Sequence, residues 1–288
     1  MEFDIVTPTT KSELLKAIKT NKNNFRFGAG YTDLILELKK KNVLNVTVIN
    51  LAQLNDKKFN SIERNLKFIR IGALVTASSI VNDKFIEKNF PVLQQAANNL
   101  ASAQIRQVAT IGGNICTASP SGDIACALVA LKAKCELLSS TGKTRTVSIL
   151  EFFLGPRKTA MKKDEILSSV LISLNEKNIN IHSGFIKVGT RRSMECSVVS
   201  LAYHIQSDKK NLITNVGIAI GSVAPTIRFA ENACGFLIGK KASSLARGEK
   251  EEFAEKVLKY ASPISDIRAT AWYRKEALFN ICKSILEN

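Results

Sequence analysis

Two short glycine-bearing turns contain the backbone amides and side chains best suited to bind a ligand. They are Gly28–Thr32 and Thr110–Asn114, and the second contains the adjacent pair Gly112-Gly113. Glycine lets the backbone approach a ligand closely, and neighbouring N–H groups of such a turn can converge on phosphate oxygens. The first turn also leads into a predicted helix, whose N-terminus carries partial positive charge. Two such turns could hold one pyrophosphate between two subdomains, although a lone glycine pair is most often a simple tight turn.

Other kinds of chemistry have weaker support in the sequence. Neither turn matches G-x-G-x-x-G or G-x-x-x-x-G-K-S/T, which disfavours a Rossmann NAD site and a nucleotide hydrolase. The six cysteines form no C-x-x-C pair, and His182 and His204 are the only histidines, so no metal site is predicted. Neither histidine lies in a hydrolase signature. We therefore expect buried free thiols in a reducing compartment, and we assign no catalytic residue and no metal ligand.

The composition is typical of a folded globular protein. The chain has 288 residues, 45% hydrophobic and 23% charged, and its length predicts two or three domains. Its formal charge of +16 often marks nucleic-acid binding, but the basic residues are scattered in small groups such as Lys39-Lys40-Lys41, so nucleic acid is a minor alternative. No apolar stretch is long enough to span a bilayer and the start has no signal-peptide pattern. We therefore expect no membrane contact and a cytoplasmic location.

Residues 1–55 are predicted to form an α/β subdomain that positions the first turn. Thr10 and Glu13 form a capping box ahead of an amphipathic helix. Phe25–Phe27 is a short apolar strand that runs into the turn. A second helix follows it, and the β-branched run Val43–Ile49 is predicted to be another strand.

Residues 56–176 are predicted to form a second α/β subdomain that positions the second turn. Helices are expected after Thr76, from Pro91 and from Asp123, the last with Asp123 as its N-cap. Strands are expected at Phe68–Ile71, Cys135–Leu138, Thr146–Ile149 and Leu167–Ile172. The segment Ser102–Asp123 is dense in Gly, Ser, Thr and Asn and is predicted to be irregular. A stretch of this kind is usually a binding loop or a wrongly assigned element.

Residues 177–288 are predicted to form an α+β domain. Its strands precede its helices, a grouping that favours an antiparallel sheet covered by helices. The strands are expected at Phe185–Val188, Val198–Ile205 and Val216–Val223, and the helices near 226–238, 249–260 and 270–286.

The residues around both turns resemble the flavin-binding signature of the molybdenum hydroxylases, the family of xanthine dehydrogenase and carbon monoxide dehydrogenase. Residues 103–114, AQIRQVATIGGN, and 117–123, TASPSGD, are similar to that signature, and Ala29-Gly30-Tyr31-Thr32-Asp33 is similar to the family's first phosphate-binding turn. Further matches occur in order at Phe152-Phe153, Gly155, Arg157-Lys158-Thr159, Lys187, Arg191-Arg192, Ile264–Arg268 and Tyr273-Arg274. The resemblance implies an FAD-binding medium subunit with an α+β architecture: a two-subdomain FAD-binding fold of the vanillyl-alcohol-oxidase/PCMH type, followed by a C-terminal α+β domain with an antiparallel sheet and helices.

The resemblance also implies cofactor-binding roles for the matching residues. The FAD pyrophosphate would be contacted by Ala29, Gly30, Thr32, Thr110, Ile111, Gly112 and Gly113. The adenosine or ribityl portions would be bound by Asn114, Ser119 and Asp123, and the predicted set also includes Tyr31, Asp33 and Gly122. Lys187 would lie near the flavin ring, where a cation could stabilise negative charge developing at N1. A bulky or charged replacement of Gly112 or Gly113 is expected to abolish FAD retention without unfolding the chain.

Two positions depart from the family pattern. Where the family usually has two adjacent glycines, this chain has Gly30-Tyr31, and a tyrosine resists a positive φ angle. Either Gly30 alone supplies the conformation, or Tyr31 packs on the cofactor, or flavin affinity is reduced. The acidic stretch that often follows the Arg-Arg pair is replaced by residues 193–196, SMEC, which leaves the electron acceptor open.

The function implied by the resemblance is electron transfer within a heteromeric enzyme. A molybdopterin-binding large subunit would hydroxylate the substrate, a small subunit would carry electrons through 2Fe–2S clusters, and FAD on this chain would pass them to NAD⁺ or another acceptor. Molybdopterin and the clusters are expected on these partners and not on this chain. The alternatives are a stand-alone FAD oxidase of the same fold and a cofactor-free scaffold subunit, which Tyr31 favours.

Overall fold

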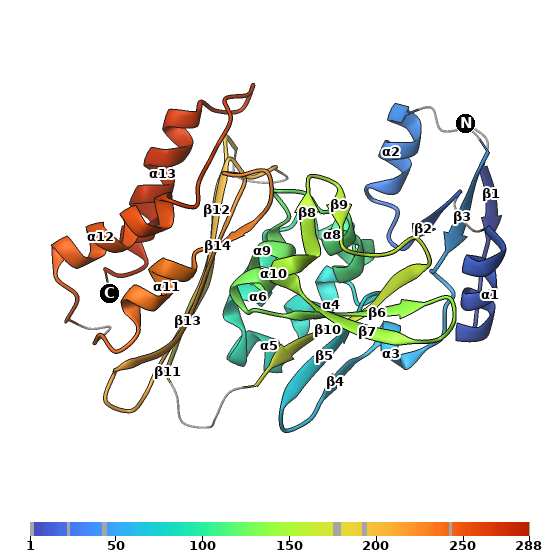
Figure 1. Ribbon diagram of the computed structural model, residues 1–288, viewed down its shortest axis with the longest axis horizontal. Coiled ribbons are helices and arrows are strands. Elements are labelled where there is room, and N and C mark those ends of the chain that lie inside the picture. The colour runs from blue at the N-terminus through green and yellow to red at the C-terminus, as the bar shows by residue number, and fades with distance from the viewer. Residues whose placement is uncertain are drawn as a thin grey trace.

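The computed structural model describes residues 3–21, 24–41, 45–174, 180–191, 195–241 and 244–287. It shows three main sheets that follow one another along the chain, with helices packed around them (Figure 1). The expected α+β fold class is confirmed. The predicted boundary between residues 55 and 56 stays a prediction, and the one between 176 and 177 lies outside the described residues.

The N-terminal unit is a three-stranded parallel sheet with strand order β1-β3-β2. Its elements are β1 (Phe3–Val6), α1 (Lys11–Asn21), β2 (Phe25–Gly28), α2 (Leu34–Lys41) and β3 (Val46–Asn50). The capping box is confirmed, because the amide of Glu13 donates to Thr10 Oγ1 at 3.2 Å and the Glu13 carboxylate accepts from the amide of Thr9. The strand β1 was not predicted, since its exposed edge position gives no apolar alternation. Val43, the predicted start of β3, lies outside the described residues.

The middle unit is a five-stranded antiparallel sheet with strand order β4-β5-β10-β6-β7, preceded and interrupted by short helices. Its strands are β4 (Ile62–Arg64), β5 (Phe68–Gly72), β6 (Lys134–Ser139), β7 (Thr144–Ser148) and β10 (Glu165–Ser173), with a separate pair β8 (Phe153–Gly155) and β9 (Lys158–Thr159). Its helices are α3 (Lys57–Asn60), α4 (Ala77–Asn82), α5 (Lys84–Asn89), α6 (Pro91–Asn98), α7 (Ala103–Val108), α8 (Ile111–Cys116), α9 (Asp123–Ala130) and α10 (Ile149–Phe152).

The expectation of an irregular segment from Ser102 to Asp123 is wrong, because it contains α7 and α8. Each begins at a hydroxyl cap: Ser102 Oγ accepts from the amide of Ile105, and Thr110 Oγ1 accepts from the amide of Gly113. Each helix is six residues long, less than two turns. Helices of this length show too little apolar periodicity to be recognised in a sequence.

The C-terminal unit is a four-stranded antiparallel sheet with strand order β11-β12-β13-β14. Its elements are β11 (Asn180–Val188), β12 (Val199–Ser207), β13 (Ile213–Gly221), β14 (Arg228–Phe229), α11 (Glu231–Leu237), α12 (Arg247–Leu258) and α13 (Ala271–Ser284). Helices α11 to α13 cover one face of this sheet, and α6 and α9 of the middle unit pack on the other (Figure 1).

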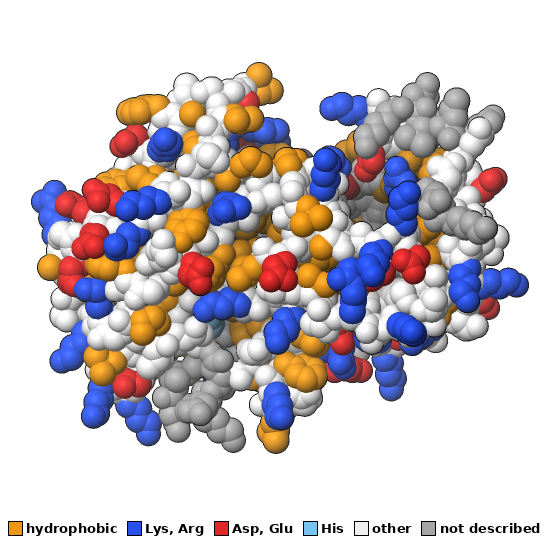
Figure 2. All heavy atoms as spheres, in the orientation of Figure 1, with side chains coloured by type: hydrophobic (Ala, Val, Ile, Leu, Met, Phe, Trp, Pro, Cys, Tyr) orange, Lys and Arg blue, Asp and Glu red, His pale blue; other side chains and the backbone are white. Residues whose placement is uncertain are grey.

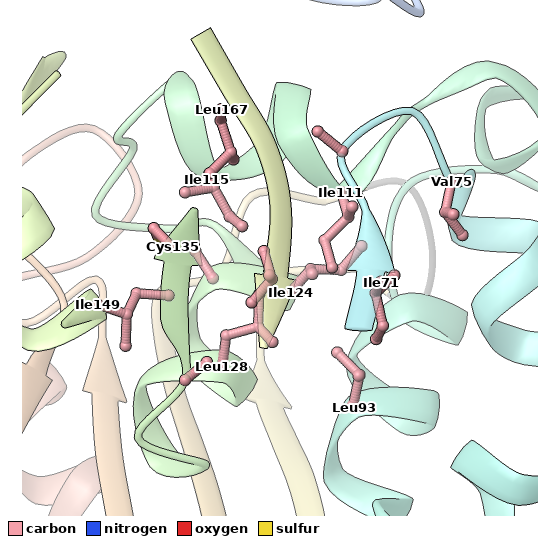
Figure 3. Close-up of a cluster of buried hydrophobic side chains, with 14 of the residues drawn as sticks. Ile71, Val75, Leu93, Ile111, Ile115, Ile124, Leu128, Cys135, Ile149 and Leu167 are labelled. Carbon is pink, nitrogen blue, oxygen red and sulfur yellow. The ribbon is translucent and has the colours of Figure 1, made fainter. Parts of the chain in front are cut away.

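The core holds the helices that carry the candidate residues. Every residue of α9 is buried, so this helix runs through the interior. Figure 3 shows Ile124 and Leu128 of α9 in one buried cluster with Ile111 and Ile115 of α8 and with Cys135 of β6. Because one core fixes both helices, the residues between them are held on a rigid frame.

The described residues contain no helix long and apolar enough to cross a membrane, and no group of three or more metal-ligating side chains. Figure 2 shows Lys and Arg side chains distributed over the visible face among acidic ones. All six cysteines are free. Four are buried as expected, Cys116 is half-buried and Cys196 is exposed.

Candidate cofactor site

The first predicted turn lies between the end of β2 and the start of α2. The Gly28 carbonyl accepts from the amide of Leu51 at 2.7 Å, which ties the end of β2 to the residue after β3. The amides of residues 29–33 donate to no acceptor in the described part of the chain. These amides are therefore available as hydrogen-bond donors to a ligand.

Tyr31 takes the left-handed conformation itself, with φ of 60°. Of the three alternatives for this position, the one in which Gly30 alone supplies the conformation does not hold. The Tyr31 ring folds back over Gly28: a Cβ on that glycine would lie 2.4 Å from the ring carbon Cζ. The ring packs with Leu34 against the small cluster of Leu38, Val46 and Val48, and burial raises the pKa of its phenol.

The second predicted turn forms the start of α8, and its amides already have partners. The amide of Ile111 donates to the Val75 carbonyl at 2.9 Å, and that of Gly112 donates to the Ala73 carbonyl at 2.8 Å. The amide of Asn114 donates to the Thr110 carbonyl at 3.0 Å. A ligand at this turn would therefore meet hydroxyl groups and Cα surfaces, and cofactor contact by these residues stays a prediction.

The two adjacent glycines of this turn have different surroundings. A Cβ on Gly112 would lie 2.7 Å from the carbonyl oxygen of Ala73, so this glycine lets α8 pack directly on the end of β5. Gly113 is exposed, and a Cβ there would meet Thr110 Oγ1 alone, at 3.1 Å. Close approach by a ligand is therefore possible at Gly113 and not at Gly112.

The two turns lie against each other. A Cβ on Gly30 would lie 1.9 Å from the carbonyl oxygen of Val108, so the first turn touches the backbone just before the second. The Thr117 hydroxyl also donates to Asp33 Oδ2 at 3.2 Å. Sequence reasoning did not assign Val108 or Thr117, since no spacing rule links residues so far apart along the chain.

The residues between α8 and α9 are held by side-chain and backbone hydrogen bonds. Asn114 Oδ1 accepts from the amide of Ala125 at 3.0 Å and so binds the first turn of α9. The Ser119 and Ser121 hydroxyls lie 3.0 Å apart. The Pro120 carbonyl accepts from the amide of Ser222 at 2.8 Å, which links this segment to the end of β13.

Asp123 is the first residue of α9, and the prediction that it is the N-cap is wrong. Gly122 is the N-cap and makes no side-chain cap bond. Asp123 Oδ2 instead lies 2.7 Å from Lys187 Nζ on β11, and the side chains are 4% and 12% exposed. Burial raises the pKa of the Asp123 carboxyl to about 6, and Lys187 opposes that rise. The structure thus brings Asp123 and Lys187 together.

Lys187 also donates to the carbonyl of Asn99, at the end of α6, at 3.2 Å. Further along, Glu195 accepts hydrogen bonds from the amides of Thr190 and Arg191, which lowers the pKa of its carboxyl. Arg192, Ser193 and Met194 lie outside the described residues.

Comparison with models of protein families gives two matches that together cover most of the chain. Residues 1–173 match the FAD binding domain in molybdopterin dehydrogenase. Residues 185–288 match the CO dehydrogenase flavoprotein C-terminal domain.

Individual relatives match over nearly their whole length. The glyceraldehyde dehydrogenase medium chain of Sulfolobus acidocaldarius is 29% identical over 277 residues, covering 96% of this chain and 94% of the relative. The xanthine dehydrogenase FAD-binding subunit of Escherichia coli is 28% identical over 289 aligned residues, covering 99% and 96%. Among solved structures, a chain of the carbon monoxide dehydrogenase from Oligotropha carboxidovorans shares the fold, with a TM-score of 0.90 and 21% identity over 99% of this chain and 96% of that one.

Proposed function

We propose, from the premise that this chain belongs to the family of FAD-binding subunits of molybdopterin dehydrogenases, that it receives electrons from 2Fe–2S clusters of a partner subunit and passes them through FAD to an acceptor. The chain is an FAD-binding subunit of an oxidoreductase of the xanthine and carbon monoxide dehydrogenase type. NAD⁺ is the proposed acceptor because a flavin can donate the two electrons as a hydride, with oxygen or a quinone as alternatives.

The contact between the two turns is the observation that carries the proposal. Gly30 lies against the Val108 carbonyl, so one diphosphate could touch both turns at once. The unpartnered amides of residues 29–33 fit this group, because such donors favour phosphate oxygens. Ala29, Gly30 and Thr32 would bind the diphosphate through these amides, and Thr110 and Gly113 would approach it from the other side.

Bound FAD would supply two-electron redox chemistry, and the chain's own residues would hold and orient it. Lys187 would place its ammonium near the flavin ring. Asn114 and Ser119, on the segment between α8 and α9, are proposed to lie along the polar portions of the cofactor. No side chain of this chain is proposed to act on the substrate of the assembled enzyme.

The proposed partners are a molybdopterin-binding large subunit and a small subunit with 2Fe–2S clusters. The matched relatives are named for glyceraldehyde and for xanthine, although each aligns with this chain over nearly its whole length. Subunits of one kind thus occur in enzymes for different substrates, which supports placing substrate recognition on a partner. The cytoplasmic location expected from the sequence stays a prediction.

Reconstitution with FAD tests this function. We expect the purified chain to retain FAD in equimolar amount through gel filtration and to show flavin absorbance in the visible range. A folded chain that stays colourless and has no affinity for added FAD would refute the proposal. That result would instead support the cofactor-free scaffold, which the bonded amides of Ile111 and Gly112 favour.

A further inference from the structure

Four large hydrophobic side chains are exposed close together along the chain, in the loop before α13 and in its first turn. This apolar patch consists of Ile264, Ile267, Trp272 and Tyr273, which are between 45% and 102% exposed. The other large hydrophobic side chains that are exposed in the described residues occur singly or in pairs along the chain. Figure 2 shows hydrophobic side chains at the upper left, where Figure 1 places this loop and the start of α13. Single exposed hydrophobic residues are ordinary on a protein surface, whereas a gathered group marks an interaction site.

A hydrogen bond closes the loop that carries the apolar patch. The amide of Ala271, the first residue of α13, donates to Ser265 Oγ at 2.9 Å. Ser265 follows Ile264 and Ala271 precedes Trp272, so this bond brings the backbones of these two patch residues near each other. Ile267 lies within the closed loop, and the patch is therefore one surface.

A buried arginine fixes this loop to the C-terminal sheet. Arg274 is 3% exposed, and its Nη1 donates to the carbonyls of Val198 at 2.6 Å and Ser222 at 2.9 Å. Its Nη2 donates to Asp266 Oδ1 of the loop at 2.8 Å. Burying a guanidinium costs free energy unless it is paired and hydrogen-bonded, and Asp266 supplies the opposite charge here. The loop is therefore anchored, and its hydrophobic side chains stay exposed instead of folding onto the core.

The apolar patch is anchored at the same end of the C-terminal sheet as the candidate cofactor residues. Val198 and Ser222 lie just before β12 and just after β13, at the end of the sheet where β11 finishes with Lys187. The amide of Ser222 also donates to the carbonyl of Pro120, in the segment between α8 and α9, at 2.8 Å. Ser222 thus connects the anchor of the patch to the segment proposed to lie along the cofactor.

We propose that the apolar patch is the docking surface for the 2Fe–2S subunit. This inference rests on the proposed function, in which the clusters of that subunit must come close to the flavin to pass electrons to it. A partner seated at this end of the sheet would lie beside the residues proposed to hold the flavin ring. The molybdopterin subunit can pass its electrons through the clusters without touching this chain. Trp, Tyr and Arg residues provide much of the binding energy at protein interfaces, and Trp272, Tyr273 and the exposed Arg268 fit such a surface.

The charges beside the apolar patch indicate what surface this partner should present. Arg268 and Lys275 are exposed there, and the whole chain has a formal charge of +16. The acidic residues there are Asp266, which is paired with Arg274, and Glu276, so the balance is positive. An apolar surface with an acidic rim on the 2Fe–2S subunit would complement it, because opposite charges at a rim speed association and disfavour wrong partners.

Photo-cross-linking of the complex purified with its natural subunits tests this surface. With p-benzoylphenylalanine in place of Trp272, irradiation should join this chain to the subunit that contains the 2Fe–2S clusters, identified by mass spectrometry of the joined peptides. The same substitution at Leu66 is the control, because Leu66 is 96% exposed in the β4–β5 turn, far from the patch in Figure 1, and should give no such product. A product with the molybdopterin subunit or with a second copy of this chain, or no product in an intact complex, would overturn the inference.

Two charged substitutions measure how much the apolar patch contributes to assembly. We expect Ile267→Asp and Trp272→Asp each to raise the dissociation constant of the complex at least about tenfold, because an aspartate in the desolvated centre of an interface has no partner. Leu66→Asp changes an equally exposed side chain and should leave the dissociation constant as in the wild type. Mass photometry of the diluted complexes measures the three constants. Wild-type values for both patch variants would contradict the docking role.

The FAD content of the complex separates failure of this inference from failure of the proposed function. The patch variants should retain FAD as the wild type does, because the patch residues are not among those proposed to bind the cofactor. If position 272 joins the 2Fe–2S subunit but the wild-type complex contains no FAD, the docking surface stands and the proposed function is refuted. If the complex contains FAD and position 272 joins another subunit, the function stands and the docking surface is wrong.

Discussion

Tyr31 and Gly28 form a coupled pair of residues in the first turn. A left-handed conformation costs a residue with a side chain roughly 1 kcal/mol, and the burial of the Tyr31 ring over Gly28 offsets this cost. The ring folds onto its own strand, and the amides of residues 29–33 keep no hydrogen-bond partner in the described part of the chain. The departure from the family's second glycine therefore need not block the site, although its effect on FAD affinity stays a prediction.

A second buried group, His204, belongs to a chain of side-chain hydrogen bonds between the middle and C-terminal units. Lys132 can only donate, so its bond at 3.4 Å fixes the orientation of Asn215, whose amide nitrogen donates to Gln206 Oε1 at 2.9 Å. Gln206 then donates to His204 Nε2, which places the ring proton on Nδ1, 2.9 Å from the Ser183 hydroxyl. Burial and Lys132 lower the pKa of His204 to about 4, so the ring is neutral at pH 7.

The lowered pKa of His204 predicts that the chain loses stability in acid. The pKa of the ring is 6.5 when exposed and about 4 when folded, so between these values the unfolded state binds more protons and stability falls as pH falls. From pH 7.5 to 5 the contribution to the free energy of unfolding should drop by about 2 kcal/mol. Denaturant unfolding of the wild type and His204→Gln at both pH values measures it.

The quantity to compare is the loss of stability on acidification in the wild type and in His204→Gln. The comparison is needed because the contribution of the Asp123 carboxyl to stability has the opposite pH dependence. Its folded pKa of about 6 lies above its ordinary value of 3.8, so its contribution to stability falls as pH rises through that window. If His204→Gln lost as much stability on acidification as the wild type, the buried neutral histidine would not be the cause.

At the scale of elements, the sequence predicted those with clear periodicity or strong caps. Pro91 opens α6, Thr76 caps α4, and β12 and β13 lie within a few residues of the predicted strands. The sequence did not reveal α7 and α8, although each has a hydroxyl cap, because the Gly, Ser, Thr and Asn residues around them favour an irregular segment and six residues show no period. Nor could it show that the amides of α8 are used by the carbonyls of Val75 and Ala73, because these partners are set by packing of distant segments.

The start of α8 provides a matched pair of variants at adjacent positions. Gly112→Ala would place a Cβ 2.7 Å from a backbone oxygen and should lower the free energy of unfolding by about 1–3 kcal/mol. A substitution of Gly112 is therefore expected to cost stability as well as FAD retention. Gly113→Ala should keep the stability within about 1 kcal/mol of wild type, since alanine favours helix, while weakening FAD binding at least tenfold.

Thermal unfolding and FAD titration of both variants test these expectations together. Gly112→Ala shows how a loss of stability affects FAD binding. Gly113→Ala shows the effect of a change in the site when stability is kept. If Gly113→Ala bound FAD as tightly as the wild type, no close approach of cofactor would occur at this turn.

At the scale of the whole molecule, one core connects the parts that would hold the cofactor. The same buried cluster includes Leu14 of α1, Leu128 of α9 and Ala219 of β13, so it runs through all three predicted segments. A Cβ on Gly217 would lie 1.8 Å from the Ala130 carbonyl, which shows how closely β13 packs on the end of α9. The first turn, the start of α9 and Lys187 are therefore held at fixed positions before any ligand binds, which lowers the entropic cost of binding.

The most direct test compares the affinities of the chain for FAD and for riboflavin, which has the same ring but lacks the diphosphate and the adenosine attached to it. If the two adjoining turns hold the diphosphate, fluorescence titration of the chain should show FAD binding at least about 100-fold more tightly than riboflavin, a difference of about 3 kcal/mol. Equal affinity for the two flavins would contradict the account, because the turns at Gly30 and Thr110 would then contribute nothing to binding.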